Sequence, residues 1–263
     1  MNRDHRANMA LNQAIDLALI ATGAPLVGTP LAIQDYSIGV AASASSRACK
    51  GPRASPRTAR IIASRKSEAP TPAAVGNVLA AINFAPKIGQ PLNRFVTIHI
   101  QAAGGLPGPQ LIGQFLKLAG DWLRLRNVQP TYVWVRETGE HKGEHVHIAI
   151  NVPPEHGRGF GHRQRGWMKA IGLRCWRGVI HTRPIGNSAS HAFSDVRYGE
   201  AYSDHLTAMI EYLLKSADPA TARAYGLAKQ REIGGVLVGK RLGTSANIGA
   251  SARANAAKHM VFS

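Results

Sequence analysis

Cysteine, aromatic residues and long apolar runs are all scarce in this chain of 263 residues. Its two cysteines, Cys49 and Cys175, lie far apart and match neither a disulfide framework nor a zinc-binding pattern. We therefore expect two ordinary reduced thiols. Aromatic residues make up only 6% of the chain, which predicts that the hydrophobic core is confined to part of it.

No apolar run approaches the roughly 18 residues that a membrane-spanning helix needs. The nearest candidate, residues 17–27, is broken by Gly23 and Pro25 and has no strongly basic leader directly before it. We interpret it as a short helix and not as a secretory signal. The sequence thus predicts a cytoplasmic protein without a membrane partner.

Acidic residues are few, with 15 Asp and Glu against 32 Lys and Arg, so the formal net charge is +17. The basic excess is spread along the chain and is not confined to one tail. Such a charge argues against a small neutral substrate and favours an anionic polymer as partner. Charge alone does not separate an enzyme acting on nucleic acid from a structural nucleic-acid binder.

The N-terminal and C-terminal parts of the chain differ from its middle in composition and in hydrophobic periodicity. Residues 38–75 are rich in Ala, Ser, Pro and Arg and show no sustained period, which is typical of a flexible basic linker. We predict a flexible basic N-terminal region over residues 1–90 and a basic C-terminal tail over 219–263 that contains at most a strand or hairpin. The folded domain is expected over 91–218.

Within residues 91–218 the hydrophobic pattern predicts alternating strands and helices. Residues 94–100 are β-branched and typical of a strand. Residues 131–137 and 144–152 flank a glycine-containing turn and predict a β-hairpin. A helix is indicated by apolar residues at spacings of three and four, namely Leu111, Phe115, Leu118, Trp122 and Leu125. Further elements are predicted as a helix at 165–171, a strand at 178–185 and a helix beginning near Asp204. This order indicates an α+β fold.

Two histidines stand two residues apart on the second strand of the hairpin. Because residues i and i+2 of a strand share a face, His145 and His147 project together, while Val146 and Ile148 face the other way. Two neutral imidazoles can hold a divalent metal if at least one more ligand is present. Without a further ligand, the same pattern also fits two half-exposed histidines that bind nothing.

Glu137 is the favoured third ligand because it ends the neighbouring strand. Its carboxylate would suit Mg²⁺ or Mn²⁺ better than a site for zinc alone. Glu140, His141 and Glu144 are also close in sequence. The hairpin register decides between these possibilities, since a slip of one residue would turn Glu137 away and bring Arg136 toward the histidines.

A tyrosine and a lysine share one face of the helix that begins near Asp204. Tyr212 and Lys215 are three residues apart, on the side opposite the apolar stripe, so the phenol is expected outside the core. A tyrosine with its ordinary pKa of about 10 is a poor nucleophile, but a nearby metal and ammonium group would make its attack on a phosphodiester plausible. Alone, the pair fits an ordinary solvated helix face.

Taken together, these motifs resemble the HUH endonucleases, and specifically the one-tyrosine initiators of rolling-circle replication. The resemblance rests on "FVTIHI", then "HVHIAI", then "YLLK", in that order, and covers about residues 92–218. It implies an RRM-like or ferredoxin-like antiparallel sheet with helices packed on it, and makes residues 91–218 the nuclease domain. The first motif is a loose match, so His99 is interpreted as an ordinary strand histidine.

The resemblance also implies a chemistry. His145, His147 and Glu137 would hold Mg²⁺ or Mn²⁺, and Tyr212 would attack the scissile phosphate of single-stranded DNA. The products would be a 5′-phosphotyrosine link and a free 3′-hydroxyl, and Lys215 would position the phosphate or the metal. The biological role implied is initiation of plasmid or phage replication at a single-stranded origin, with the host replication machinery as a further partner.

Other residues of the same types are interpreted as accessory or structural. Tyr198 and Tyr202 have the spacing of a two-tyrosine enzyme but no suitably placed lysine, and Tyr225 lies beyond the helix. The remaining histidines match no zinc pattern and are taken as ordinary: His141, His156, His162, His181, His191 and His205. Basic residues in two glycine-containing stretches are candidate DNA contacts, namely Arg163, Arg165, Lys240 and Arg241. Trp134, Trp167 and Trp176 are candidates for base stacking or for the core.

Three alternatives remain open from the sequence. A one-tyrosine transposase would share the motif order, whereas a relaxase would carry its tyrosine before the histidines. A cupin-like metal protein would want a glutamate where Ile150 or Asn151 stands. A non-catalytic binder with an RRM-like sheet would fit both the predicted fold and the charge.

Overall fold

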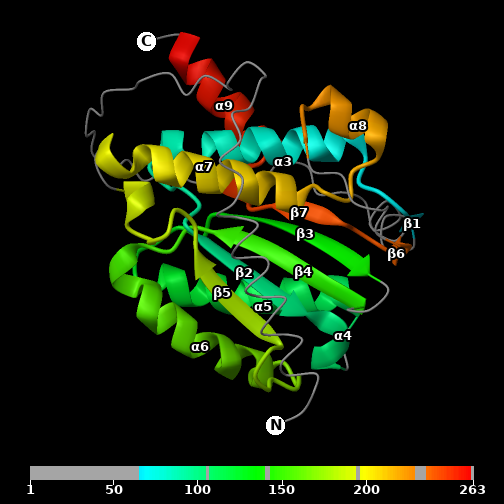
Figure 1. The fold of residues 1–263 in the computed structure, drawn as a ribbon. Helices are drawn as coiled ribbons and strands as arrows, with labels where there is room; N and C mark the ends of the chain where they lie inside the picture. Colours follow the sequence, from blue (N-terminus) through cyan, green and yellow to red (C-terminus); the bar gives the residue numbers. More distant parts are fainter. Residues whose placement is uncertain (1–64, 105–106, 140–142, 194–195, 229–234, 262–263) are drawn as a thin grey trace. The chain divides into compact units, whose positions relative to one another are not determined.

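The computed structural model describes residues 65–104, 107–139, 143–193, 196–228 and 235–261 (Figure 1). All of them belong to one unit that spans Ala54–Ser263. The predicted short helix at 17–27, Cys49, and most of the predicted linker at 38–75 lie outside the described residues.

A five-stranded antiparallel sheet forms the centre of the described part of the chain, in the order β5-β2-β4-β3-β7. In chain order, the strands β2, β3, β4 and β5 alternate with the two long helices α5 and α6 in the order β-α-β-β-α-β. This connectivity and strand order are compatible with a ferredoxin-like fold, so the predicted α+β class with an antiparallel sheet is confirmed. The strands are β2 (Arg94–His99), β3 (Tyr132–Gly139), β4 (Gly143–Ile150), β5 (Ile180–Pro184) and β7 (Leu242–Thr244).

One face of the sheet is covered by α5 (Gly108–Arg124) and α6 (Gly157–Ala170), with the short α4 (Ile100–Ala103) beside them. The predicted apolar stripe of α5 packs here against strand residues such as Val146 and Ile148, and Trp134 and Trp167 belong to the same core. Leu125 is an exception, because the helix ends at Arg124 and leaves Leu125 83% exposed.

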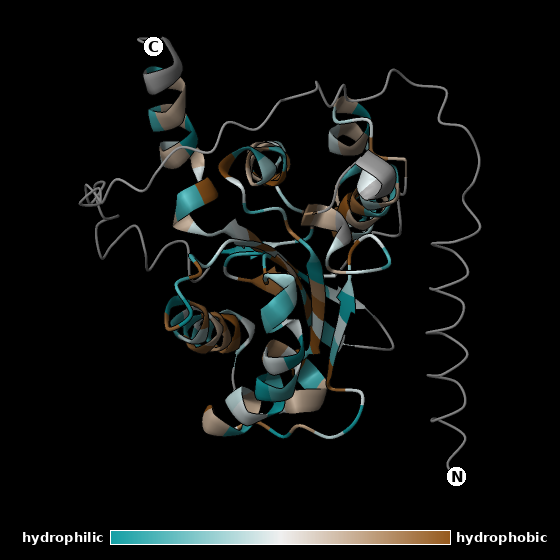
Figure 2. Ribbon diagram, turned by 90° about the vertical axis from the view of Figure 1, so that its left-hand side faces the viewer, coloured by the Kyte–Doolittle hydropathy of each residue, from teal (hydrophilic) through white to brown (hydrophobic). Residues whose placement is uncertain are grey.

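The other face is covered by α3 (Pro72–Phe84) and α7 (Val196–Leu213). Apolar residues of both helices pack on Val133, Val135 and Ala149 of the sheet. Figure 2 shows this arrangement from the side, with apolar segments in the strands and in the adjoining helices. Helices therefore pack on both faces of the sheet, and on the face of α3 and α7 the β2 residues Phe95, Thr97 and His99 are half-buried.

The structure differs from the prediction at both ends of the domain expected over 91–218. The predicted flexible region contains α3, which is capped by Thr71 and starts with Pro72, an arrangement that favours a helix start. The predicted tail contributes α8 (Pro219–Ala224), β6 (Leu237–Val238), β7 and α9 (Ala250–Val261). Small residues and very short strands dominate these segments, so they show no strong period. β6 pairs with β1 (Lys66–Ser67), which joins the segment before α3 to the segment after α8.

Helix α7 begins at Val196, well before the start predicted near Asp204. Short 3₁₀ helices complete the described elements: η1 (Pro86–Ile88), η2 (Pro154–His156), η3 (His191–Phe193) and η4 (Ala246–Ile248). Among the helices of the described residues, none combines the length and the apolar character that crossing a membrane would require.

Asn93 ties the start of β2 to two other segments. Its fully buried side chain donates hydrogen bonds from Nδ2 to the carbonyls of Val152 (2.8 Å) and Ala189 (2.9 Å), and its Oδ1 accepts one from Val152 N–H (2.9 Å). We expect Asn93→Ala to lower the free energy of unfolding by about 2 to 4 kcal/mol, because it leaves buried backbone groups unsatisfied. Urea unfolding measures this change.

Gln129→Ala is the matched control, since Gln129 is exposed, and we expect it to stay within about 0.5 kcal/mol of the parent. An Asn93→Ala variant as stable as this control would contradict the role assigned to Asn93.

Candidate metal and nucleophile site

The register of the β3–β4 hairpin places Glu137 directly opposite His145, and Val135 opposite His147. Directly opposed residues of an antiparallel pair project from the same face. Glu137, His145 and His147 therefore share one face, the one that lies under α3 and α7. The one-residue slip that would exchange Glu137 for Arg136 does not occur.

Arg136 shows what fixes this register. It is buried on the opposite face of the sheet, where its Nε donates a hydrogen bond to Glu144 Oε1 (2.7 Å). Its Nη1 donates to the carbonyls of Val238 (3.1 Å) and Lys240 (2.8 Å). A slip would remove this guanidinium from its partners and leave a buried charge uncompensated, which is costly. Glu144, an alternative ligand in the sequence, is engaged here and not at the histidines.

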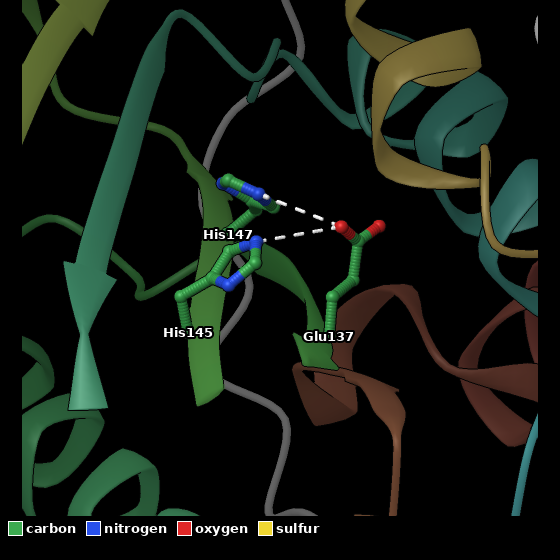
Figure 3. Close-up of side chains that lie close together, drawn as sticks. All are labelled: Glu137, His145 and His147. Carbon is green, nitrogen blue, oxygen red and sulfur yellow. Dashed lines mark ion pairs between the residues drawn. The ribbon is translucent and has the colours of Figure 1, made fainter. Parts of the chain in front are cut away.

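The three side chains form a compact set of ligand atoms (Figure 3). Glu137 Oε2 lies 3.5 Å from His145 Nε2 and 4.0 Å from His147 Nε2. All three residues are buried, and their ligand atoms lie within 4.8 Å of one another. The triad could hold a metal ion, as the sequence predicted. Glu140 and His141, the other candidates for the third ligand, lie outside the described residues.

Neighbouring groups orient both imidazoles. His145 Nδ1 lies 3.0 Å from the carbonyl of Gly143, which can only accept, so Nδ1 carries a proton, and Nε2 faces Glu137 Oε2 at 3.5 Å. His147 Nδ1 lies 2.9 Å from the Thr97 hydroxyl on β2. Metal-binding histidines are commonly held in this way, with the second ring nitrogen bound to a carbonyl or another polar group.

Glu137 supplies a further indication that the triad fits a cation. Its Oε1 is buried and accepts no hydrogen bond from any of the described residues. A buried carboxylate oxygen without a donor is costly, and a bound cation would remove that cost. Two imidazole nitrogens and one carboxylate form a donor set that suits a divalent transition metal such as Mn²⁺.

The end of α7 brings Tyr212 and Lys215 onto this triad. The Lys215 ammonium donates a hydrogen bond to Glu137 Oε2 and lies 3.9 Å from the centre of the Tyr212 ring. The Tyr212 ring centre lies 4.9 Å from that of His147 and 6.0 Å from that of Phe95 on β2. The five side chains singled out in the sequence thus lie together in one site.

The position of Lys215 corrects one detail of the sequence interpretation. The sequence predicts Lys215 on the polar, outer face of the helix, but in the structure it is buried. The helix ends at Leu213, so the chain has left the helical path before Lys215 and the lysine turns toward the sheet.

Opposing effects set the ionisation of Glu137. Burial alone would raise its pKa, but the hydrogen bond from His145 and the charge of Lys215 outweigh burial and lower the pKa below its ordinary value. The carboxylate is therefore ionised at neutral pH. Its stabilising contribution is present above the pKa of the unfolded chain and is lost as the pH falls through the lowered pKa of the folded state.

Two histidines that sequence reasoning set aside extend the site. His99 on β2 is paired with His145, and their ring centres lie 5.9 Å apart. His181 on β5 lies 5.8 Å from His99, ring centre to ring centre, and its Nε2 lies 2.8 Å from the carbonyl of Gly178. The alternation of Phe95, Thr97 and His99 along β2 is a signal for this face, but only once the pairing of β2 with β4 is known.

The other tyrosines occupy different environments. Tyr202 donates a hydrogen bond from its hydroxyl to the carbonyl of Leu92 (2.9 Å), and burial raises its pKa, so it is a structural residue. Tyr225 is exposed, and its hydroxyl donates to the carbonyl of Pro72 (3.1 Å). The side chain of Tyr198 is not among those that the structure describes.

The predicted DNA contacts and stacking residues are dispersed. Arg163 and Arg165 are exposed on α6, on the face of the sheet opposite the triad, and Lys240 is exposed beside β7. Arg241 differs from the prediction because it is buried and its Nε donates to the Ser67 hydroxyl (2.9 Å). Of the three candidate tryptophans, Trp134 and Trp167 are core residues and Trp176 is 52% exposed.

No family model matches this chain, and neither a curated protein nor a solved structure does.

Replacing one imidazole tests the triad as a metal site. We expect the chain to bind one Mn²⁺ in isothermal titration calorimetry and His147→Ala to weaken binding by more than about 100-fold, since loss of supporting groups around a metal already costs about 10- to 100-fold. His162→Ala is the control, because His162 is exposed on α6. Equal Mn²⁺ affinity in the two variants would exclude His147 as a ligand.

Removing the ammonium group tests the coupling between Lys215 and Glu137. Without metal, we expect Lys215→Met to lower the free energy of unfolding by about 3 kcal/mol at neutral pH, because Glu137 loses a buried partner. Added Mn²⁺ should restore part of that loss in thermal unfolding. Lys117→Met, which removes an exposed pair with Asp121, should cost less than about 1 kcal/mol. A Lys215→Met protein that Mn²⁺ stabilises no more than the parent would contradict the coupling.

Proposed function

We propose that the protein is a metal-dependent endonuclease of the HUH type, which nicks and rejoins single-stranded DNA through a 5′-phosphotyrosine intermediate. The observation that carries this proposal is the meeting of Glu137, His145 and His147 with Tyr212 and Lys215 on one face of an antiparallel sheet. In this proposal the protein acts in the cytoplasm and initiates rolling-circle replication of a plasmid or phage. Its partners are single-stranded origin DNA and the host replication machinery.

The triad fits the Mg²⁺ or Mn²⁺ that such an enzyme needs. Glu137 is ionised, His145 presents Nε2 to it, and Glu137 Oε1 has no donor among the described residues. A divalent cation held there would act as a Lewis acid, drawing electron density from the phosphodiester.

Tyr212 is the proposed nucleophile. Its phenolic oxygen attacks the scissile phosphorus, forming the phosphotyrosine bond as the bond from phosphorus to the 3′-oxygen breaks. The phenol gives its proton to water, and the departing 3′-oxygen takes one up to become a hydroxyl. Rejoining reverses these steps, with the 3′-hydroxyl attacking the phosphotyrosine.

Lys215 supplies positive charge beside this nucleophile. Its ammonium lies 3.9 Å from the centre of the Tyr212 ring, where it can attract an oxygen of the phosphate that Tyr212 attacks. Burial under α7 strengthens such electrostatic effects because little water screens them.

Two features of the chain suit a single-stranded substrate. The formal charge of +17 favours a polyanion. Trp176 is exposed in the loop before β5, the strand that bears His181, and such a ring can stack on an unpaired base.

The alternatives receive less support. The sheet face of an RRM-like binder would be open to nucleic acid, but here both faces carry packed helices. The positions where a cupin would want its glutamate hold Ile150 and Asn151, both buried. A one-tyrosine transposase would use the same five side chains, and its DNA substrate would be a transposon end instead of a replication origin.

Removing one hydroxyl tests the proposed nucleophile. We expect Tyr212→Phe to lower Mn²⁺-dependent nicking of single-stranded DNA by at least about 1000-fold, because loss of a nucleophile removes the covalent route. Binding of the same oligonucleotides should change little. A pool of single-stranded sequences followed by sequencing of the nicked products measures activity and reports the preferred site.

Tyr225→Phe is the matched control, since it makes the same change at an exposed tyrosine outside the site. If Tyr212→Phe nicks as fast as Tyr225→Phe, Tyr212 is not the nucleophile.

A further inference from the structure

A basic groove lies at the edge of the sheet, between the segment that leads into α3 and the turn from β6 to β7. Its volume is about 250 Å³, and Pro70 and Leu242 are among the apolar residues that line it. The polar side chains that line it are Arg65, Ser67, Thr71, Asn77, Lys240, Arg241 and Thr244.

Backbone hydrogen bonds join the two segments that form the walls of this groove. Lys66 and Ser67 pair with Val238 and Leu237, and Gly239 N–H donates to the carbonyl of Arg65 (2.8 Å). Arg241 is buried in the wall. Its guanidinium donates to the hydroxyl of Ser67 (2.9 Å). This buried cation therefore stabilises the wall and adds positive charge beneath the groove surface.

Two further cations stand at the groove surface. Arg65 and Lys240 are exposed, and within the described residues neither has a carboxylate at ion-pair distance. No acidic side chain lines the groove among the described residues. Lys240 Nζ lies 5.7 Å from the centre of the Trp134 ring. Gly243 leaves room for this approach, because a Cβ there would lie 3.0 Å from Lys240 Nζ and 2.8 Å from Trp134 Nε1.

We propose that this groove binds a backbone phosphate of the nucleic-acid strand, separately from the phosphate that undergoes cleavage. Three positive charges, nearby hydroxyl groups and no lining carboxylate suit a phosphodiester. The inference rests on the proposed function for its ligand, single-stranded DNA, and adds a second point of attachment outside the strands β2 to β5.

The groove is directly connected to the metal triad. Arg136 N–H donates to the carbonyl of Arg241 (2.6 Å), and Glu137 is the next residue along β3. Leu242, which lines the groove, is paired with Val135 on the face that carries the triad. In this proposal one phosphate of the strand lies at Tyr212 and another, further along the same strand, lies in the groove, which would retain the DNA while its cleaved end is free.

The salt dependence of DNA binding tests this groove. In a Tyr212→Phe background of the full chain, we expect the double variant Arg65→Ala, Lys240→Ala to bind a fluorescent 20-nucleotide single strand more weakly. The slope of log affinity against log salt concentration should fall by about 0.7 for each phosphate that the protein no longer neutralises. Lys87→Ala is the control, because it removes an equally exposed cation beyond the far end of α3, about 20 Å along that helix. An unchanged slope in the double variant would overturn the proposal.

Two further arms separate the possible causes. Titration with inorganic phosphate as the sole ligand tests whether the groove binds only the free ion. If the double variant loses phosphate binding but keeps the parental salt slope with DNA, the groove does not bind a phosphate of the DNA strand, and the proposal is overturned. The groove variants with Tyr212 intact should still form the covalent adduct at saturating DNA. A chain that forms no adduct but shows the expected fall in slope would support the groove while contradicting the proposed nuclease.

Discussion

Two buried charges of opposite sign stand next to each other on β3 and point to opposite faces of the sheet. Arg136 is held on one face by Glu144 and by the carbonyls of Val238 and Lys240. Glu137 is held on the other by Lys215 and His145. Because a slip of one residue would place each charge among the partners of the other, this pair fixes the hairpin register, and the register in turn assembles the triad.

The elements outside the β-α-β-β-α-β core turn that triad into a buried site. Helices α3 and α7 cover the face that carries it, and α7 ends where Tyr212 and Lys215 can reach Glu137 and His147. Strand β7 extends the sheet beside β3, and its turn from β6 accepts hydrogen bonds from Arg136. The same additions thus bury the ligand atoms and stabilise the strand that bears Glu137, and burial strengthens the electrostatic interactions in the site.

Much of this arrangement could be predicted from the sequence, because its signals are local. The period of α5, the alternation in β4 and the shared face of His145 and His147 each depend on a few neighbouring residues. The sequence suggests Glu137 as the third ligand but does not fix it, since the face to which its side chain points depends on the register between β3 and β4. Other features had no local signal: α3 is rich in small residues, β7 has only three residues, and the burial of Lys215 follows from where α7 ends. His99 and His181 joined the site only through the order of strands, which no single segment encodes.

The most direct test of the proposed chemistry is to identify the residue that becomes linked to DNA. The chain would be incubated with single-stranded DNA and Mn²⁺, digested with nuclease and trypsin, and the nucleotide-bearing peptide sequenced by mass spectrometry. Tryptic cleavage gives one peptide, residues 198–215, that contains Tyr198, Tyr202 and Tyr212, and fragmentation distinguishes them. We expect the nucleotide on Tyr212. A nucleotide on any other residue, or no adduct in a protein that binds Mn²⁺ and DNA, would contradict the account.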